Sequence, residues 1–242
     1  MKNDENSLQK AQAEFISTVS HELRTPLTSI RGFADTLLTS GDKLSEEQKQ
    51  KFILIIKEQA NRLIKLTENL LAVSKNEVEK LVLKSVDVTL LIENCVGLVA
   101  AQNKKNTFNC KIDKNLPKIL VDTDKFQQIM LNIVENATKY SNPETEVQIS
   151  VTSDDRFVII KVSDIGIKID EKDKLRIFEK FTRLSTPLTQ KIEGSGLGLY
   201  LTKTLVERMK GTIGADSDGD KTVFTVKFPI SAYDDDARTK MK

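Results

Sequence analysis

Two long stretches of the chain repeat apolar residues at heptad spacing, and they constrain the fold more than any other feature. The first stripe is Ile16, Val19, Leu23, Pro26, Ile30, Phe33 and Leu37, and the second is Phe52, Ile56, Gln59, Leu63, Leu66, Leu70 and Val73. This spacing predicts two helices with coiled-coil-like seams, at about residues 7–39 and 45–76. Gly41 and Asp42 supply turn chemistry between them, and Ser45 with Gln48 forms a capping box that starts the second helix.

A helical hairpin of this kind cannot bury both apolar stripes by itself. We therefore expect two chains to pair through residues 13–77 and form a dimeric four-helix bundle. In the alternative arrangement the hairpin packs on the chain's own globular domain, which would leave one stripe exposed to water.

His21 is the only histidine of the chain and lies on the first predicted helix. At about 100° per residue, its imidazole points away from the seam formed by Val19 and Leu23, so it should face solvent or a visiting partner. Thr25 lies one turn further along the same face, and Pro26 predicts a bend because proline has no N–H to donate. On these residues alone, a solvated surface histidine remains the alternative.

Composition excludes several classes of function. The net charge of +2 argues against a nucleic-acid partner. No apolar run reaches the roughly 18 residues that span a bilayer, and the polar start has no signal-peptide core, so the chain is expected to be soluble and cytoplasmic. Cys95 and Cys110 follow no metal or redox spacing, and their apolar surroundings predict buried free thiols in a reducing compartment.

After Lys75 the long heptads give way to short mixed elements, which places a domain boundary near residues 76–80. This pattern predicts an α+β two-layer sandwich. Strands are expected at residues 81–85, 107–112, 119–121, 146–153, 157–163, 211–215 and 222–229. Helices are expected at residues 87–101, 123–140 and 196–209, and the charged tail from Ala232 is expected to be disordered.

Asn132 and Asn136 lie four residues apart on one face of the predicted helix 123–140, with Lys139 one turn beyond Asn136. Two neighbouring amides offer oxygen ligands to a magnesium ion that also binds nucleotide phosphates, and a lysine adds a positive charge. An ordinary amphipathic helix with a polar outer face explains the same residues.

Asp164 and Gly166 stand where a predicted strand runs into a turn, in the segment "VSDIGIKID". A buried carboxylate at this place can accept a hydrogen bond from the adenine amino group, and a glycine lets the base approach the backbone. The alternative is a common strand-to-loop turn.

Three glycines, Gly194, Gly196 and Gly198, open the last predicted helix together with Leu197. The free N–H groups and positive dipole end of such a helix can receive phosphate oxygens. A glycine-rich loop alone is weak evidence for a nucleotide site.

These segments, and the order in which they occur, resemble those of a known protein family. "SHELRTPLTSI" resembles the phospho-acceptor box of sensor histidine kinases, and the segments around Asn136, Asp164 and Gly196 resemble the family's N box and its two glycine boxes. "RIFEKFTRL" resembles the phenylalanine box through Phe178 and Phe181. Because all boxes occur in family order across nearly the whole chain, it is identified as similar to the catalytic core of a two-component sensor histidine kinase.

The resemblance implies a phosphotransfer hairpin followed by an ATP-binding domain of the GHKL type. ATP and Mg²⁺ are expected, with Asn132 and Asn136 at the metal. The remaining nucleotide residues implied by the family motifs are Lys139, Tyr140, Asp164, Gly166, Gly194, Gly196, Leu197 and Gly198. The segment 182–193 resembles the mobile lid, and its charges Arg183 and Lys191 are placed to meet phosphates.

The resemblance also implies a mechanism. His21 accepts the γ-phosphoryl group at Nε2, and Glu22 accepts a hydrogen bond from Nδ1–H, which fixes the tautomer. The group then passes to an aspartate on the receiver domain of a response regulator. Thr25 matches the position associated with phosphatase activity in kinases that have it. Whether the transfer occurs within one chain or between two remains open.

The segment 1–12 resembles the end of an upstream signalling helix, so the chain is expected to be the core of a larger protein that reaches a membrane only through a missing sensor. The expected domains are residues 13–77 for dimerisation and phosphotransfer, 78–231 for ATP binding and 232–242 for the tail.

One residue departs from the family pattern. Lys168 stands where the first glycine box normally has a second glycine, and a positive φ at this position would cost about 1–2 kcal/mol. This departure motivates one rival interpretation, a degenerate kinase that acts as a dimeric scaffold or phosphatase. A GHKL ATPase that drives a clamp is the other.

Overall fold

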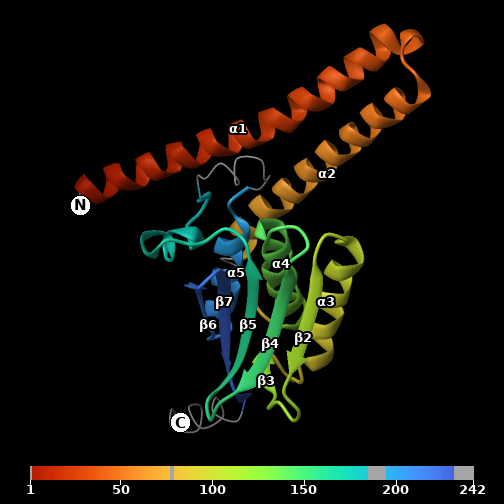
Figure 1. Cartoon of the computed structure of the whole chain (residues 1–242). Coiled ribbons are helices and arrows are strands. Elements are labelled where there is room, and N and C mark those ends of the chain that lie inside the picture. Colours follow the sequence, from red (N-terminus) through yellow and green to blue (C-terminus); the bar gives the residue numbers. More distant parts are fainter. Residues whose placement is uncertain (1, 77–78, 185–194, 232–242) are drawn as a thin grey trace. The chain divides into compact units, whose positions relative to one another are not determined.

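The computed structural model describes residues 2–76, 79–184 and 195–231, and the chain divides into two compact units, residues 1–75 and 76–242 (Figure 1). Side chains are described from Ile16 onward, apart from residues 18 and 72–76. Each unit is considered by itself. Among the helices of the described residues, none is long and apolar enough to cross a membrane.

The first unit is the helical hairpin that the heptads predict. Helix α1 spans Lys2–Ser40, a 3₁₀ turn spans Gly41–Lys43, and α2 spans Glu46–Asn76. The capping box is confirmed, because Ser45 N–H donates to Gln48 Oε1 at 2.9 Å and Gln48 N–H donates to Ser45 Oγ at 3.3 Å. Helical conformation continues through Pro26, so the proline does not end α1.

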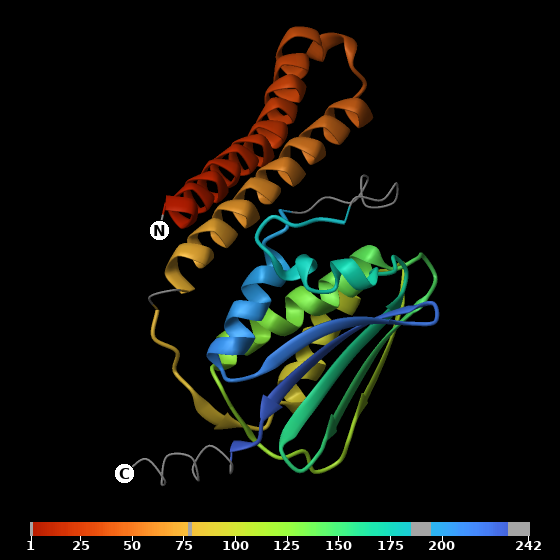
Figure 2. The ribbon, with the colours of Figure 1, turned by 90° about the vertical axis from the view of Figure 1, so that its left-hand side faces the viewer.

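The two helices run antiparallel beside each other (Figure 2) and pack through part of their apolar residues. The rings of Phe33 and Phe52 lie 5.1 Å apart between centroids, and Pro26 and Leu66 are buried. Other large apolar side chains remain more than half exposed, namely Ile16, Leu27, Leu38, Ile53, Leu54, Ile64 and Leu71. A single hairpin therefore leaves substantial apolar surface uncovered, as its composition predicts.

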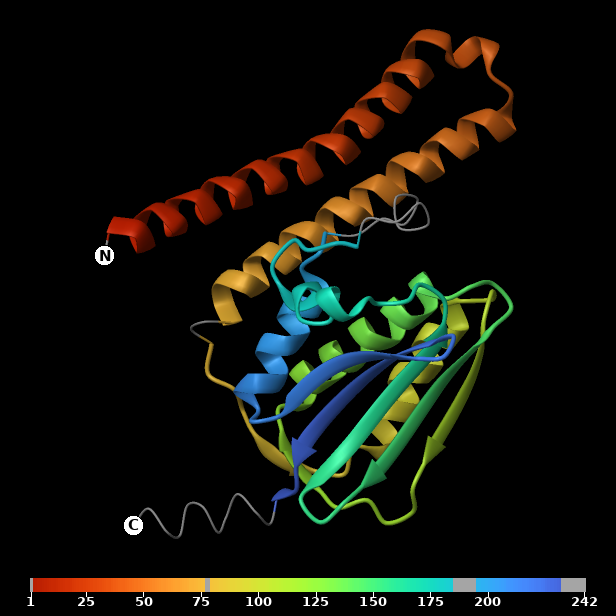
Figure 3. The ribbon, with the colours of Figure 1, turned by 60° about the vertical axis from the view of Figure 1, so that its left-hand side comes forward.

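The second unit contains a five-stranded sheet in the order β2-β4-β5-β7-β6, with only β2 and β4 parallel (Figure 3). Its strands are β2 Thr107–Ile112, β4 Glu146–Ser153, β5 Phe157–Ile165, β6 Thr212–Asp218 and β7 Lys221–Pro229. The buried positions alternate along β4, β5 and β7, so one face of the sheet is apolar and the other is polar.

Three helices cover the apolar face: α3 Thr89–Gln102, α4 Thr123–Tyr140 and α5 Gly198–Arg208. Helix α4 packs between α3 and α5 and rests on β5. Its buried face includes Phe126, whose ring lies 5.6 Å from that of Phe228 on β7. The two-layer sandwich predicted from the sequence is confirmed.

A small antiparallel sheet joins β1 Lys84–Val86 to β3 Ile119–Val121, and two 3₁₀ turns, Glu171–Asp173 and Arg176–Phe178, follow β5. Strand β1 starts later than expected, because residues 79–83 form an extended strap that binds side chains of α5 and of the start of α4. Helix α5 begins at Gly198, since Gly196 has a φ of +67° that a helix cannot contain.

The prediction for Cys110 was wrong. Both cysteines are free and Cys95 is buried, but Cys110 is exposed. Cys110 lies on β2 at the edge of the sheet, where no further strand of the described residues covers it. Partial burial still raises the pKa of the Cys110 thiol, and Glu93 on α3 raises it further.

Candidate functional site

Asp164 is the buried polar residue at the centre of the candidate site. It lies near the end of β5 opposite Thr222 of β7, on the face of the sheet that the helices cover, and only 2% of it is exposed. Its Oδ2 is buried with no hydrogen-bond partner among the described residues. Desolvation raises the pKa of this carboxyl to about 7. A buried acceptor without a partner is costly unless a ligand supplies the donor.

A pocket opens beside Asp164. Most of its lining is apolar, which suits a flat aromatic base between hydrophobic side chains. The lining residues are Asn136, Tyr140, Asp164, Ile167, Ile169, Ile177, Thr182, Arg183, Leu184, Leu199, Thr222 and Phe224.

Helix α4 brings its polar residues to two different places. Asn136 and Tyr140 line the pocket, whereas Asn132 donates from Nδ2 to Thr202 Oγ1 on α5 at 2.7 Å. The Asn132 oxygen faces Gly198, where an added Cβ would lie only 2.5 Å from Oδ1. Asn132 thus presents its oxygen to the first turn of α5. Lys139 is exposed, with its ammonium 5.5 Å from the Tyr140 ring centroid.

Gly166 lies close to Asp164, but the space beside it is filled. An added Cβ would lie 2.0 Å from the Tyr140 carbonyl oxygen and 2.8 Å from Ser141 Cα. A β-bridge between Gly166 and Ser141 and a hydrogen bond from Ile167 N–H to the Tyr140 carbonyl make the same junction. The absence of a side chain at Gly166 therefore lets the end of α4 approach the backbone. The sequence suggested that it lets the nucleotide base approach.

The glycine-rich loop meets the segment that precedes the lid. Phe181 N–H donates to the Gly196 carbonyl at 3.0 Å, and a Cβ on Gly196 would lie 2.6 Å from the Phe181 carbonyl carbon. A side chain at position 196 would be unfavourable for two reasons: the φ is positive, and the Cβ would collide with Phe181. Leu197 is fully buried and precedes α5. Among the residues that the structure describes no side chain caps this helix, so its first N–H groups can receive an anion.

The strain argument for Lys168 is wrong. Lys168 does not have a positive φ, and its ammonium pairs with Asp220 at 3.3 Å on the surface. A lysine can adopt this backbone conformation without cost, so the residue gives no physical reason to expect a weakened nucleotide site.

Arg183 lines the pocket and is close enough to Tyr140 to affect its titration. Burial raises the pKa of the Tyr140 hydroxyl, and the positive charge of Arg183 partly offsets this effect. Two further predicted residues, Lys191 and Gly194, lie outside the described residues, as does most of the predicted lid and the tail from Ala232.

The hairpin holds the second group of predicted residues. His21 is exposed on α1, as its helical position predicts. Glu22 contacts α2, where its Oε2 lies 3.4 Å from Nη2 of Arg62. The Thr25 hydroxyl donates to the His21 carbonyl at 3.2 Å, which is the local backbone bond expected of a helical threonine.

Sequence reasoning missed the apolar wall of the pocket and one polar member. Thr222 is buried on β7, and its hydroxyl donates to the Ile167 carbonyl at 2.8 Å, which fixes the turn after Asp164. The alternation along β7 already places Thr222 and Phe224 on the inner face, so this signal was available. Arg62 was also missed, because the register of the hairpin is needed to pair it with Glu22.

Among the described residues, no three or more His, Cys, Asp or Glu side chains gather closely enough to hold a metal ion.

Two family models match the chain. Residues 11–79 match the His Kinase A (phospho-acceptor) domain. Residues 121–232 match the family described as histidine kinase-, DNA gyrase B- and HSP90-like ATPase. The matched ranges contain His21 and Asp164, respectively, so both groups of residues described above fall within recognised domains.

Curated relatives include the sensor protein kinase WalK of Staphylococcus haemolyticus, which is 34% identical over 239 residues, and WalK of Staphylococcus aureus, which is 32% identical. Both alignments cover 96% of this chain. The chain spans 39% of the first relative's length and 57% of the second's.

Solved structures of similar fold include the Acinetobacter baumannii histidine kinase AdeS, with a TM-score of 0.68, 24% identity and coverage of 87% of this chain and 98% of that one. The structure of histidine kinase ThkA in complex with the response regulator TrrA has a TM-score of 0.74 and 22% identity. The match covers 93% of this chain and 64% of that one. The structure of full-length ShkA in complex with AMPPNP has a TM-score of 0.65 and 28% identity. The match covers 90% of this chain and 46% of that one.

Proposed function

We propose, from the premise that this chain belongs to the two-component sensor histidine kinases, that it transfers the γ-phosphoryl group of ATP to His21 and then passes it to an aspartate of a response regulator. The observation that carries this proposal is the buried Asp164, whose Oδ2 has no described partner in a largely apolar pocket. An adenine amino group would supply the missing donor, and the apolar walls would hold the base.

The residues present fit a nucleotide with its magnesium ion. Asn132 directs its oxygen toward the first turn of α5, Asn136 lines the pocket, and the N–H groups at the start of α5 are open to phosphate. Bound Mg²⁺ would supply charge neutralisation at the phosphates, with Asn132 and Asn136 as its protein ligands. Lys139, Arg183 and, from the family pattern, Lys191 would add positive charge.

On the hairpin, His21 has the exposure that a phosphoryl acceptor needs. Glu22 can hold the Nδ1–H of His21 and leave Nε2 as the nucleophile, provided that its side chain swings from Arg62 toward the imidazole. Proton transfer and charge stabilisation at this point are the chain's own contribution, since phosphoryl transfer is otherwise mainly positioning.

Dimerisation through residues 13–77 is part of the proposal. The exposed apolar residues of the hairpin recur on α1 at Ile16, Leu27 and Leu38, and on α2 at Ile53, Ile64 and Leu71. A second hairpin would cover these residues in a four-helix bundle. A regulator's receiver domain would then approach the exposed side of α1, where His21 and Thr25 lie.

The test is the chemistry of the phosphorylated product. The chain is incubated with γ-labelled ATP and Mg²⁺, and the labelled protein is treated with acid or base. A phosphohistidine loses its label in acid and keeps it in base. Release of free phosphate without protein label would favour the ATPase-clamp alternative, and label that survives acid would place the phosphate on a residue other than histidine. An unlabelled chain that binds ATP would favour the degenerate scaffold.

A further inference from the structure

A row of three side chains crosses the end of the sheet beside the pocket. Asp164 of β5 lies opposite Thr222 of β7, and Thr222 lies opposite Ser217 of β6, the strand at the edge of the sheet. Residues that lie opposite each other on paired strands share one face of the sheet. Ser217 therefore stands on the same helix-covered face as the buried carboxylate of Asp164.

The hydroxyl of Ser217 binds both backbone groups of Ile169, in the segment that follows β5. Ile169 N–H donates to Ser217 Oγ at 3.1 Å, and Ser217 Oγ donates to the Ile169 carbonyl at 3.2 Å. A serine hydroxyl can do this because it is a donor and an acceptor at the same time. One side chain on the edge strand thus replaces the pair of hydrogen bonds that a neighbouring strand would exchange with Ile169.

Ile169 is part of the apolar wall of the pocket. It lines the pocket together with Ile167 and Ile177, and only 6% of the residue is exposed. Attraction between apolar atoms falls steeply with distance, and a gap of about 0.5–1 Å loses a quarter to a half of it. The affinity of this wall for a flat base therefore depends on where the backbone holds Ile169.

Two ion pairs also join this segment to the β6–β7 hairpin, but both lie on the surface. Lys174 Nζ lies 2.7 Å from Asp216 Oδ1, and Lys168 Nζ lies 3.3 Å from Asp220 Oδ1. The side chains of Asp216 and Asp220 are 71% and 86% exposed, and ion pairs this open to water contribute little. Ser217 is therefore the contact expected to decide where this part of the wall lies.

We infer that Ser217 is a positioning residue for the nucleotide base: its hydroxyl holds Ile169 in the wall against which the base packs. This inference rests on the proposed function. Ser217 is not among the described residues that line the pocket, so it acts through Ile169. Without the hydroxyl, the N–H and the carbonyl of Ile169 lose this partner, and the segment can shift away from the base.

The test compares serine variants of the full chain by calorimetry with ATP and Mg²⁺. Ser217→Ala is expected to bind ATP about fivefold more weakly than the wild type, which corresponds to one hydrogen bond of ordinary strength. Ser217→Thr keeps the hydroxyl and should bind ATP within about twofold of the wild type. The matched control is Ser150→Ala on β4, whose side chain lies on the opposite, polar face of the sheet and whose loss should leave ATP affinity unchanged.

Single-turnover labelling at saturating ATP separates positioning of the base from damage to the reaction. Once the site is filled, Ser217→Ala should label His21 within about twofold of the wild-type rate, because the wall holds the base and not the phosphates. A thermal scan checks that each variant is folded. If Ser217→Ala is not, Ser217→Cys takes its place, since a thiol is of similar size but is a weak donor and acceptor.

A double-mutant cycle shows whether Ser217 acts through Ile169. Ile169→Ala should itself weaken ATP binding by about fivefold or more, because it removes the side chain from the wall. In the Ile169→Ala background, Ser217→Ala should change ATP affinity by less than about twofold, since no isoleucine is left to position.

Equal ATP affinities of Ser217→Ala and Ser150→Ala would overturn the inference. It would also be overturned if Ser217→Thr failed to restore binding, if labelling at saturating ATP slowed in parallel with the loss of affinity, or if the losses from Ser217→Ala and Ile169→Ala multiplied. A wild-type chain that binds no ATP overturns the proposed function, and the inference falls with it. A wild type that binds ATP no better than Ser217→Ala overturns the inference alone.

Discussion

The Glu22 carboxylate and the Arg62 guanidinium face each other across the helical hairpin, with 3.4 Å between Oε2 and Nη2 and about one-fifth of each side chain exposed. Glu22 is next to His21, yet neighbouring residues in a helix lie about 100° apart. In this conformation Glu22 on α1 pairs with Arg62 on α2, while His21 is exposed. Phosphorylation of His21 with help from Glu22 therefore requires a change of side-chain conformation.

We predict that Glu22→Gln slows labelling of the protein by about a hundredfold or more, because the amide is a weaker acceptor for Nδ1–H and cannot stabilise the imidazolium. ATP affinity should stay the same. Stability should change by no more than about 1 kcal/mol, since a partly exposed ion pair contributes little. The control is Glu58→Gln, which neutralises an exposed acid of α2. An unchanged labelling rate in Glu22→Gln would remove Glu22 from the mechanism.

The register of this hairpin could have been predicted from the sequence. A loop centred between residues 42 and 43 pairs residues whose numbers add up to about 85, and Glu22 with Arg62 and Phe33 with Phe52 fit this rule. The strands of the second unit were also predicted well, because alternation is a strong local signal, as is the capping box at Ser45 in the first unit. The alternation and the caps depend on residues close together in the sequence, whereas the hairpin register depends on where the loop is centred.

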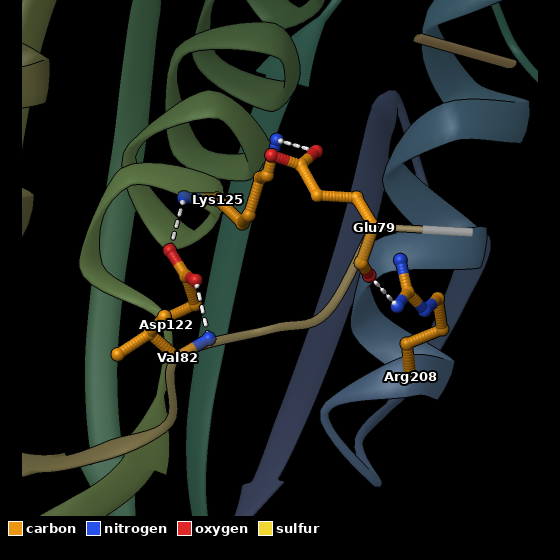
Figure 4. A network of polar contacts seen from close by, with 5 residues as sticks. All are labelled: Glu79, Val82, Asp122, Lys125 and Arg208. Carbon is orange, nitrogen blue, oxygen red and sulfur yellow. Dashed lines mark hydrogen bonds and ion pairs between the residues drawn. The ribbon is translucent and has the colours of Figure 1, made fainter. Parts of the chain in front are cut away.

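What could not be predicted depends on contacts between distant segments. The close approach of Gly166 to the Tyr140 carbonyl, the negative φ of Lys168 and the exposure of Cys110 all follow from how strands and helices meet. Motif matching identified Gly166 as a constrained position, but it did not predict the contact with Tyr140. Arg208 binds the carbonyl of Glu79 (Figure 4), which lies more than a hundred residues away, so no local pattern connects the two residues.

Asp164 should make stability depend on pH. Its pKa of about 7 in the folded protein lies above the ordinary value of 3.8, so between about pH 4 and pH 7 the folded state binds a proton that the unfolded state has lost. Stability from this group therefore falls as pH rises through that window, by up to about 4 kcal/mol. We predict that the free energy of unfolding of Asp164→Asn does not fall in this way. Urea unfolding of the variant and the wild type at about pH 4.5, 6 and 8 measures the difference.

The control for this prediction is Asp155→Asn, which neutralises an exposed carboxylate in the turn after β4. Adenosine, which has no titrating phosphates, supplies a second measurement. Its affinity for the wild type should rise from about pH 6 to about pH 8, and Asp164→Asn should bind it about tenfold or more weakly. A pH-independent difference in stability would contradict the burial of a charged carboxylate.

Gly166→Ala should be strongly destabilising, by about 3 kcal/mol or more, because its Cβ would lie 2.0 Å from the backbone oxygen of Tyr140 and one of the two segments must move. The matched control is Gly214→Ala on β6, where an added Cβ meets nothing within 4 Å. It should be neutral or slightly stabilising. Urea unfolding measures both variants, and equal stabilities would show that the junction of β5 and α4 adapts freely.

Thr25→Ala should leave labelling of the kinase within a few fold of wild type, because the hydroxyl bonds to the His21 carbonyl and has no evident part in forming phosphohistidine. It should sharply slow dephosphorylation of the regulator, since the same hydroxyl can orient a water toward a phosphoaspartate. Thr28→Ala, also exposed on α1, is the control. If the phosphorylated regulator has the same lifetime with Thr25→Ala and wild type, the threonine has only its structural bond.

The most direct measurement of the central claim is the position of the label. Wild type and His21→Ala are incubated with γ-labelled ATP and Mg²⁺, the phosphorylated residue is mapped by mass spectrometry under neutral conditions, and ATP affinity is measured for both. Because His21 is exposed on the hairpin and Asp164 lies buried in the other unit, we predict label on His21 alone in the wild type, none in His21→Ala, and equal ATP affinity. Label that persists in His21→Ala, or that maps elsewhere in the wild type, would contradict the account.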